Sequence, residues 1–301
     1  MHYNGNIYRP PFESGSLLLQ VTQGCSHNQC NFCTMYRNVT FRMEPIEQIA
    51  ADLEEAKEYC PDIDRVFLLS GDAFCLSGFR LQAIAKLIRE KLPKVETIVM
   101  YASVKNIMTK TNAELRELRR LGINQLNVGL ESGHDKTLAA MNKGVSAQET
   151  LTQLLRLKDA GIQYGANIIF GLAGREYSRE HAIETAEILN KTSPYLIFTG
   201  TIHASPGCPL YEQMQSGQFQ ELTIGEYLEE EELFLQHLDV DQCFLFGLHP
   251  SNVIRLQGWL SRDKEKLLGF VEDHRRQLSR EQLRSIPVRK GEGGIVYEEN
   301  Q

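Results

Sequence analysis

The chain has 301 residues, of which 42% are apolar and 24% are charged, and this composition is typical of an ordinary globular protein. It contains no run of 18 apolar residues and no apolar signal core in residues 1–10, so we expect neither a membrane span nor export and place the protein in the cytoplasm. The formal charge of −7 argues against a large nucleic-acid footprint, because such a footprint needs basic residues to neutralise phosphates.

Six apolar, β-rich segments recur along the first two thirds of the chain. They are SLLLQVT (16–22), RVFLLS (65–70), TIVMYAS (97–103), QLNVGLE (125–131), YGANIIFG (164–171) and YLIFTGTIH (195–203). Their apolar residues are continuous rather than alternating. This pattern indicates strands that are buried on both faces, as in a parallel sheet.

Helical patterns lie between these segments. Pro45 suits a first helical position, and apolar residues follow it on one helical face. Two capping-box pairs and two terminal glycines give further helix boundaries: Thr111 with Glu114, Ser146 with Glu149, Gly122 and Gly161. The chain therefore reads as a βα unit repeated six times.

Six parallel βα units are too few for the usual eight-stranded barrel, so the fold that fits best is a partial, open (β/α)6 TIM-like barrel. A doubly wound sheet is the alternative. The pattern changes near residue 212, and we expect a barrel domain over 1–212 and a mostly helical extension over 213–301. In the extension we expect one helix over 226–238, one or two over 263–285, and a frayed tail from residue 289.

Three of the seven cysteines, Cys25, Cys30 and Cys33, lie close together directly after the first predicted strand, and the other four are scattered. In a reducing compartment this distribution indicates a metal site and isolated thiols rather than disulfides. In parallel βα folds the loops after the strands carry the chemistry. Here those loops concentrate glycines, acids and thiols.

Four interpretations of the cysteine cluster compete. A zinc site would need His27 as its fourth ligand, although His27 lies awkwardly between the first two thiols. A [2Fe-2S] site would need Cys60, which instead falls on the apolar face of the helix that begins at Pro45 and is expected in the core. Unligated structural cysteines are a third option. The fourth is a [4Fe-4S] cluster that is held by three thiolates and leaves one iron open to a ligand.

The chain resembles the radical S-adenosylmethionine (radical SAM) superfamily over about residues 16–211. The resemblance rests on the three cysteines and on motifs that occur in order: Phe32, SGD (70–72), GLESG (129–133), FGLAGRE (170–176) and SPGCPLY (205–211). The last two are similar to the branch that contains oxygen-independent coproporphyrinogen oxidases, methylthiotransferases and Elongator-type enzymes. One departure is that four residues separate the first two cysteines, where the family commonly has three.

The resemblance implies a [4Fe-4S] cluster and SAM as cofactors, with Cys25, Cys30 and Cys33 as the metal ligands. It also implies that Phe32 shields the cluster and that Ser70, Gly71 and Asp72 contact the amino group of SAM. Ser103 would contact the methionyl group of SAM, and Glu131 the ribose or the amino group. Ile169 would contact adenine, and Arg175 the carboxylate. Simpler roles remain open for four of these residues. Asp72 could be a turn acid and Glu131 a salt-bridged acid. Ile169 could be a core residue, and Arg175 could be solvated.

Cys75 and Cys208 follow strand ends and are candidates to donate hydrogen or form a covalent link in catalysis, although a lone cysteine is more often a small buried residue. His203, at the end of the sixth predicted strand, is a candidate for proton transfer. Two further polar residues, His249 and Asn252, are candidates for substrate contact. For each of these polar side chains a structural hydrogen bond is the competing role.

The expected function is therefore that of a radical SAM enzyme of the oxidoreductase type, which cleaves SAM reductively and abstracts hydrogen from a small-molecule substrate. The resemblance implies a flavodoxin- or ferredoxin-type electron donor as partner. One alternative is a non-catalytic protein that handles clusters or haem on the same fold. An RNA-modifying enzyme is another, and the acidic charge counts against it.

Overall fold

The protein is described by a computed structural model that covers residues 1–290 and 294–296. The chain divides into two compact units. The first unit comprises Met1–Asn28, Met35–Gly129 and Thr152–Tyr164. The second comprises Gln29–Thr34, Leu130–Leu151 and Gly165–Gln301. The division that we predicted near residue 212 stays a prediction.

The strands of the first unit are parallel. They run in the order β1 (Leu17–Gln20), β4 (Arg65–Leu69), β5 (Thr97–Ala102) and β6 (Ile123–Glu131). One face carries a buried cluster of Phe67, Leu69 and Val99, against which Leu18 and Tyr101 pack. The opposite residues of these strands are also buried, which is why the predicted segments are apolar throughout.

The second unit continues the pattern with β7 (Gln163–Phe170), β8 (Leu196–Thr201), β9 (Phe244–Gly247) and β10 (Leu256–Trp259). Pairing is parallel from β7 to β9, and β10 is antiparallel to β9. All six predicted strands are confirmed as members of a mostly parallel, eight-stranded sheet. Strands β9 and β10 were not predicted, and they add to the sheet from within the predicted helical extension.

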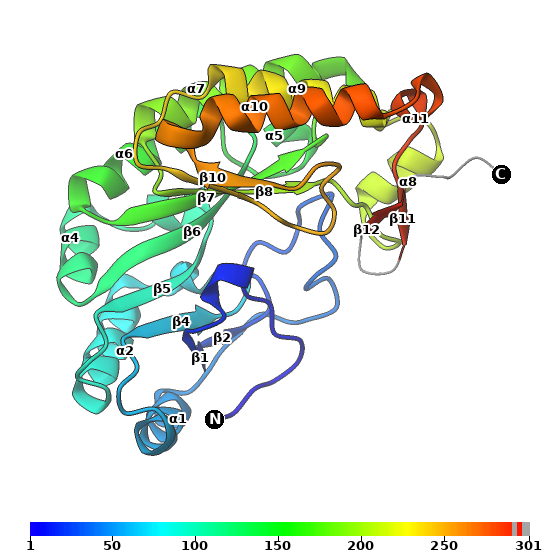
Figure 1. The fold of residues 1–301 in the computed structure, drawn as a ribbon. Coiled ribbons are helices and arrows are strands. Elements are labelled where there is room, and N and C mark those ends of the chain that lie inside the picture. The colour runs from blue at the N-terminus through cyan, green and yellow to red at the C-terminus, as the bar shows by residue number, and fades with distance from the viewer. Residues whose placement is uncertain (291–293, 297–301) are drawn as a thin grey trace. The chain divides into compact units, whose positions relative to one another are not determined.

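The helices are α1 (Ile46–Tyr59), α2 (Gly78–Lys91), α3 (Val104–Met108), α4 (Asn112–Arg120), α5 (Asp135–Ala140), α6 (Ala147–Ala160), α7 (Ser178–Thr192), α8 (Pro209–Gln215), α9 (Ile224–His237), α10 (Leu260–Gln277) and α11 (Arg280–Arg284). Short 3-10 turns span η1 (Pro11–Glu13), η2 (Ala73–Cys75) and η3 (Arg175–Tyr177). In the second unit α7, α9 and α10 lie side by side (Figure 1). No helix in the described part of the chain is long and apolar enough to cross a membrane.

Helix boundaries follow the predicted caps. The hydroxyl of Thr111 accepts a hydrogen bond from the Glu114 amide (3.1 Å), and the Glu114 carboxylate accepts one from the Thr111 amide (2.7 Å). The Ser146–Glu149 pair forms the same reciprocal bonds. Gly122 and Gly161 follow the ends of α4 and α6 with φ of 95° and 74°, which favour glycine.

Two small strand pairs complete the fold. Strand β2 (Thr22–Gln23) pairs antiparallel with β3 (Arg42–Met43), and β11 (Val288–Lys290) pairs antiparallel with β12 (Gly294–Val296). These last two strands were not predicted, and they fall largely within the segment that we expected to be a frayed tail. Residues 291–293 and 297–301 of that tail lie outside the described part of the chain.

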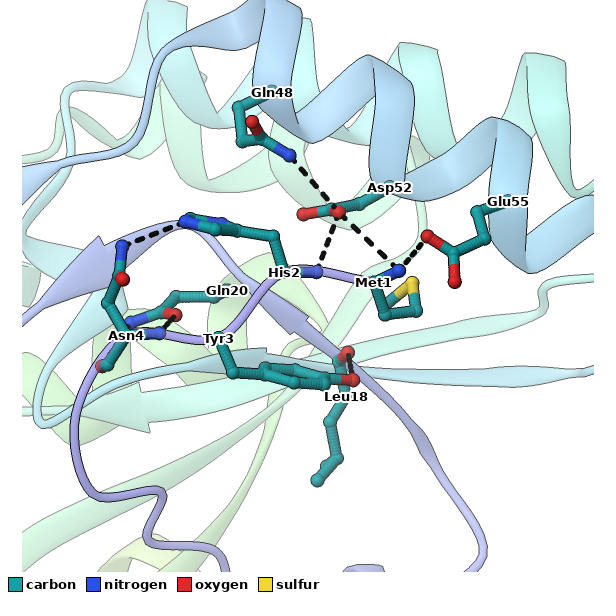
Figure 2. A network of polar contacts seen from close by, with 9 residues as sticks. All are labelled: Met1, His2, Tyr3, Asn4, Leu18, Gln20, Gln48, Asp52 and Glu55. Carbon is teal, nitrogen blue, oxygen red and sulfur yellow. Dashed lines mark hydrogen bonds and ion pairs between the residues drawn. The ribbon is translucent and has the colours of Figure 1, made fainter.

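The amino-terminal segment lies along the edge strand β1 (Figure 2). The Tyr3 hydroxyl donates to the Leu18 carbonyl (2.9 Å), and Asn4 and Gln20 exchange hydrogen bonds at 2.7 and 3.2 Å. The His2 amide donates to the Asp52 carboxylate on α1 (2.8 Å). These contacts cover polar groups of a strand edge that would otherwise be open to other chains.

Candidate active site

In the first unit, Asp72 anchors the loop that carries Cys25. The Asp72 side chain is only 3% exposed, and it accepts hydrogen bonds from both the backbone amide (2.8 Å) and the hydroxyl of Ser26. The Asn106 amide on α3 also donates to it (3.4 Å). Charge-assisted bonds of this kind are about twice as strong as neutral ones. The carboxylate therefore orients the residue directly after Cys25.

Gly71 lets this loop approach closely. A β-carbon added at Gly71 would lie 2.7 Å from the Tyr36 ring, a distance that real side chains do not adopt, and 3.0 Å from the Cys25 β-carbon, which is unusually close. The Gly71 amide donates to the Gly24 carbonyl (3.1 Å), and the Ser70 amide donates to the Thr22 hydroxyl (3.2 Å). The predicted SGD turn and Cys25 are thus in direct contact.

Ser103 caps helix α3. Its hydroxyl accepts from the Asn106 amide nitrogen (3.3 Å), and the Asn106 side chain accepts from the Ser103 amide (2.8 Å). Asn106, which both completes this cap and contacts Asp72, was not predicted. The Ser-x-x-Asn spacing was the available signal. The predicted contact of Ser103 with SAM stays a prediction.

Cys75 lies at the end of η2, beside a buried lysine. Burial raises the pKa of the Cys75 thiol to about 12, and the charge of Asp72 adds to the effect. Burial lowers the pKa of Lys110 to about 8, while its ammonium donates to the Phe74 carbonyl (3.0 Å) and the Asn106 carbonyl (3.3 Å). At neutral pH Cys75 keeps its proton, which suits hydrogen donation better than nucleophilic attack.

In the second unit, the segment between Cys30 and Cys33 is held by Asn31. The Asn31 backbone amide donates to the Met141 carbonyl (3.0 Å), and its side chain donates to the Ala140 carbonyl (2.7 Å). The Cys33 amide donates to the Cys30 carbonyl (3.2 Å), which closes a tight turn. Asn31 is a second residue that the sequence analysis missed, because its partners lie more than a hundred positions away.

Lys143 joins two of the predicted cofactor residues. Its ammonium lies 3.4 Å from the Glu131 carboxylate and 6.0 Å from the centre of the Phe32 ring. Burial raises the pKa of Glu131, and the charge of Lys143 opposes that increase. Glu131 has a φ of 65°, an uncommon backbone conformation that often marks functional turns. This geometry is that of a buried salt-bridged acid whose cationic partner, among the residues that the structure describes, is Lys143.

A buried polar network supports the turn after Glu131. The Ser132 hydroxyl lies 2.8 Å from His181 Nδ1 and accepts from the His134 amide (3.0 Å), and the Gly133 amide donates to the Thr185 hydroxyl (2.7 Å). Burial lowers the pKa of His181 to about 4, so the ring is neutral. Helix α7 thus holds the GLESG turn through His181 and Thr185.

Helix α9 holds the loop that follows β7. The Gly171 amide donates to the Glu230 carboxylate (2.6 Å), to which Ser178 also donates, and a β-carbon at Gly171 would clash with Tyr227 at 2.3 Å. Arg175 pairs with Glu226 at 2.8 Å. The predicted contact of Arg175 with the SAM carboxylate is not tested, and it would require Arg175 to leave or share this partner.

The remaining predicted residues have varied surroundings. Ile169 is half-buried on β7, and His203 is exposed after β8. Cys208 is buried, where it precedes α8 and its thiol contacts the Ser205 carbonyl (3.2 Å). His249 contacts the Ser251 hydroxyl (2.7 Å), and Asn252 donates to two carbonyls. These are structural hydrogen bonds, the role that competes with substrate contact for both residues.

Within residues 1–290 and 294–296, no three His, Cys, Asp or Glu side chains are arranged to hold a single metal ion. In a [4Fe-4S] cluster each thiolate binds a different iron, so the three sulfur atoms need not converge on one point. The donor set, which is three thiols without a fourth, fits a cluster with one open iron.

Comparison with known proteins supports this assignment. The sequence profile of the Radical SAM superfamily matches residues 19–189. The heme chaperone HemW of Bacillus subtilis (strain 168) is 23% identical over 202 residues, which cover 64% of this chain and 52% of HemW. This chain therefore spans about half of that relative's length.

Two solved structures have the same fold. The coproporphyrinogen III oxidase HemN of Escherichia coli has a TM-score of 0.54 at 17% identity, with 73% of this chain and 52% of HemN covered. The Elp3 protein of Methanocaldococcus infernus has a TM-score of 0.52 at 16% identity, with 90% of this chain and 64% of Elp3 covered. The prediction of a partial TIM-like barrel is confirmed.

Proposed function

Because the chain belongs to the radical SAM superfamily, as its sequence motifs predicted, we propose that it binds a [4Fe-4S] cluster through Cys25, Cys30 and Cys33 and cleaves SAM reductively. The observation that carries this proposal is that three thiols stand within nine residues, directly after the first strand and inside the matched region. When bound, the cluster and SAM supply a 5'-deoxyadenosyl radical that abstracts hydrogen from the substrate.

The chain's own residues would bind and orient these cofactors. Asp72 fixes the Cys25 loop, and its remaining acceptor capacity is suited to the SAM amino group. Phe32 provides an apolar surface that excludes water beside two of the cysteines. Glu131, held by Lys143, offers a preorganised acceptor for ribose hydroxyls or for the amino group. Cys75 holds a proton that can be donated.

We propose a small-molecule substrate, a flavodoxin- or ferredoxin-type electron donor and a cytoplasmic location. The electron donor follows from the proposed chemistry, because one electron must enter the cluster for each SAM molecule that is cleaved. The substrate class follows from the acidic charge, which disfavours long nucleic acids.

The test is anaerobic reconstitution followed by three measurements. Wild-type protein should hold about four irons and four sulfides per chain, change its EPR signal when SAM is added, and release 5'-deoxyadenosine under reducing conditions. The triple variant C25A/C30A/C33A should do none of these. One zinc per chain without sulfide would overturn the proposal.

The similarity to HemW favours a second candidate, a non-catalytic protein that handles haem on the same fold. The two candidates differ in one assay. A haem carrier should bind haem with a shifted Soret band and form no 5'-deoxyadenosine, whereas the enzyme should form 5'-deoxyadenosine in the absence of haem.

A further inference from the structure

A short segment of the first unit, Met35–Met43, packs against the loop that carries Cys25, and we call it the flap. Its final residues form β3, where Arg42 pairs with Gln23 and Met43 with Thr22. Gly24 and Cys25 directly follow Gln23 in the chain. A β-carbon added at Gly24 would lie 3.3 Å from the Val39 carbonyl, so the flap touches the residue before Cys25.

The base of the flap is also fixed to the Cys25 loop. The Asn28 side chain donates to the Tyr36 carbonyl (2.7 Å), and the Val39 amide donates to the same carbonyl (2.9 Å). Tyr36 itself is buried, and its ring is 2.7 Å from the position of a β-carbon on Gly71. The flap is therefore an ordered cover on the Cys25 loop and not a detached insertion.

The flap contains large apolar side chains that are exposed. Met35 is 44% exposed, Val39 is 39% exposed and Met43 is 56% exposed. Three of the nine flap residues are therefore exposed and apolar, and exposed apolar side chains that gather on one segment can mark a protein interaction site. Methionine is common on surfaces that bind partners of varied shape, because its side chain is flexible and polarisable.

The flap also carries positive charge, although the whole chain is acidic. Residues 35–43 contain Arg37 and Arg42 and no acid, whereas the formal charge of the chain is −7. Arg42 is exposed and makes no ion pair with any residue that the structure describes. The acid that follows the flap, Glu44, is buried and accepts a hydrogen bond from Gln23 (2.7 Å), so it does not neutralise the exposed surface.

A third cation lies beside the same loop. The Lys105 ammonium on α3 is 3.5 Å from His27 Nδ1, and His27 is two residues after Cys25. Cations thus flank the Cys25 loop from two elements. Such a surface attracts an acidic partner at long range and increases the rate of association.

We propose that the flap is the docking surface for a small acidic protein that carries one electron, of the flavodoxin or ferredoxin class. This rests on the proposed function, in which Cys25 is a cluster ligand on the loop against which the flap packs. One electron leaves the reduced carrier, which becomes oxidised, and enters the cluster, which becomes reduced, and no bond forms or breaks. Encounters between electron-transfer proteins use small interfaces, below about 1,200 Å² in total. A nine-residue segment with flanking cations can supply a large part of such an interface.

The experiment compares two charge-reversal variants of reconstituted protein. R37E/R42E reverses the flap, and K86E/R116E makes the same net charge change at exposed positions on α2 and α4. Cluster reduction is followed by its visible absorbance after mixing with a reduced bacterial flavodoxin, or with dithionite, at low ionic strength.

With flavodoxin we expect R37E/R42E to be reduced at least about tenfold more slowly than K86E/R116E, and its rate to lose most of its salt dependence. With dithionite, which needs no docking surface, all proteins should be reduced at equal rates. Equal rates for the two variants with flavodoxin would overturn the proposal. A second result would also overturn it: the wild-type chain dimerises through the flap, and the R37E/R42E variant is monomeric but is reduced by flavodoxin at an unchanged rate.

Docking is also measured on the protein without a cluster, by titration with flavodoxin at low salt. There R37E/R42E should bind at least about tenfold more weakly than K86E/R116E, and equal affinity would overturn the docking proposal. A wild-type chain that fails to assemble a cluster but retains this difference would refute the proposed function alone. The two failures are thus distinguishable.

Discussion

The ammonium of Lys143 lies 3.4 Å from the carboxylate of Glu131, and both side chains are nearly buried. Removing one partner of a buried ion pair leaves an uncompensated charge, which typically costs about 3–5 kcal/mol. We expect K143M to lower the free energy of unfolding by an amount near the lower end of that range, as measured by urea denaturation. The double variant K143M/E131Q should recover most of the loss, because no charge is then left unpaired.

The same pair gives a cofactor readout. If Glu131 contacts SAM, E131Q should weaken SAM binding in reconstituted protein more than K143R does, since K143R keeps the cation that holds Glu131 in place. Equal SAM affinity in E131Q and wild type would leave Glu131 as a structural acid only.

Asp72 has two candidate roles, and a pair of variants separates them. D72N removes the carboxylate charge, whereas S26A removes one hydrogen bond to Asp72 and keeps the charge. A charge-assisted hydrogen bond is worth about 1.5–3 kcal/mol, so D72N should weaken SAM binding by roughly one to two orders of magnitude while the cluster remains.

The S26A variant is the control for this effect. If Asp72 contacts SAM, S26A should bind SAM nearly as well as wild type in a calorimetric titration. If both variants lose SAM affinity and iron to the same extent, Asp72 acts only by holding the Cys25 loop.

Two adjacent buried acids on α9 predict a pH dependence of stability. Burial raises the pKa of Glu231 to about 8, with the charge of Glu230 adding to it, and burial raises the pKa of Glu230 to about 7. Between the ordinary value of 4.5 and these values, the folded chain holds protons that the unfolded chain releases. Stability is therefore lost as the pH rises from about 4.5 to 8.

The variant E231Q removes one of these titrations. At pH 8 we expect it to be more stable than wild type by at least about 1.4 kcal/mol, the worth of one pKa unit, and the difference should vanish near pH 4.5. Urea denaturation at several pH values measures this. The exposed neighbour Glu229 supplies the control, since E229Q should show no such trend. A pH-independent effect of E231Q would contradict the assignment.

Cys60 tests the number of cluster ligands. It lies at the end of α1, half-buried, with its thiol 3.1 Å from the Ala56 carbonyl. The expected core position is thus wrong in detail, because the helix ends at Tyr59 and leaves Cys60 partly exposed. We expect C60A to retain the iron content and the SAM-dependent EPR change of wild type. Loss of the cluster in C60A would favour four-thiolate ligation.

Much of the fold was readable from local chemistry. Continuous apolar runs identify strands buried on two faces, and the Thr111–Glu114 and Ser146–Glu149 pairs identify helix starts, because each signal depends on neighbours in sequence. The three candidate cluster ligands were also grouped by the sequence alone, because all three stand on one short segment, and their role as ligands stays a prediction. By contrast, β9 has only four residues and follows a helix, so its place in the sheet depends on pairing with β8.

The supporting residues of the candidate site depend on the tertiary structure. Asn106 contacts Asp72 across 34 positions, and Asn31 contacts Ala140 across 109 positions. An asparagine or a lysine carries no signal of its own partner, because its hydrogen bonds and charge act through space, and only the folded chain decides which acceptor is within reach. The residue types at the strand ends therefore define the chemistry, and the packing of distant segments decides which side chains hold them in position.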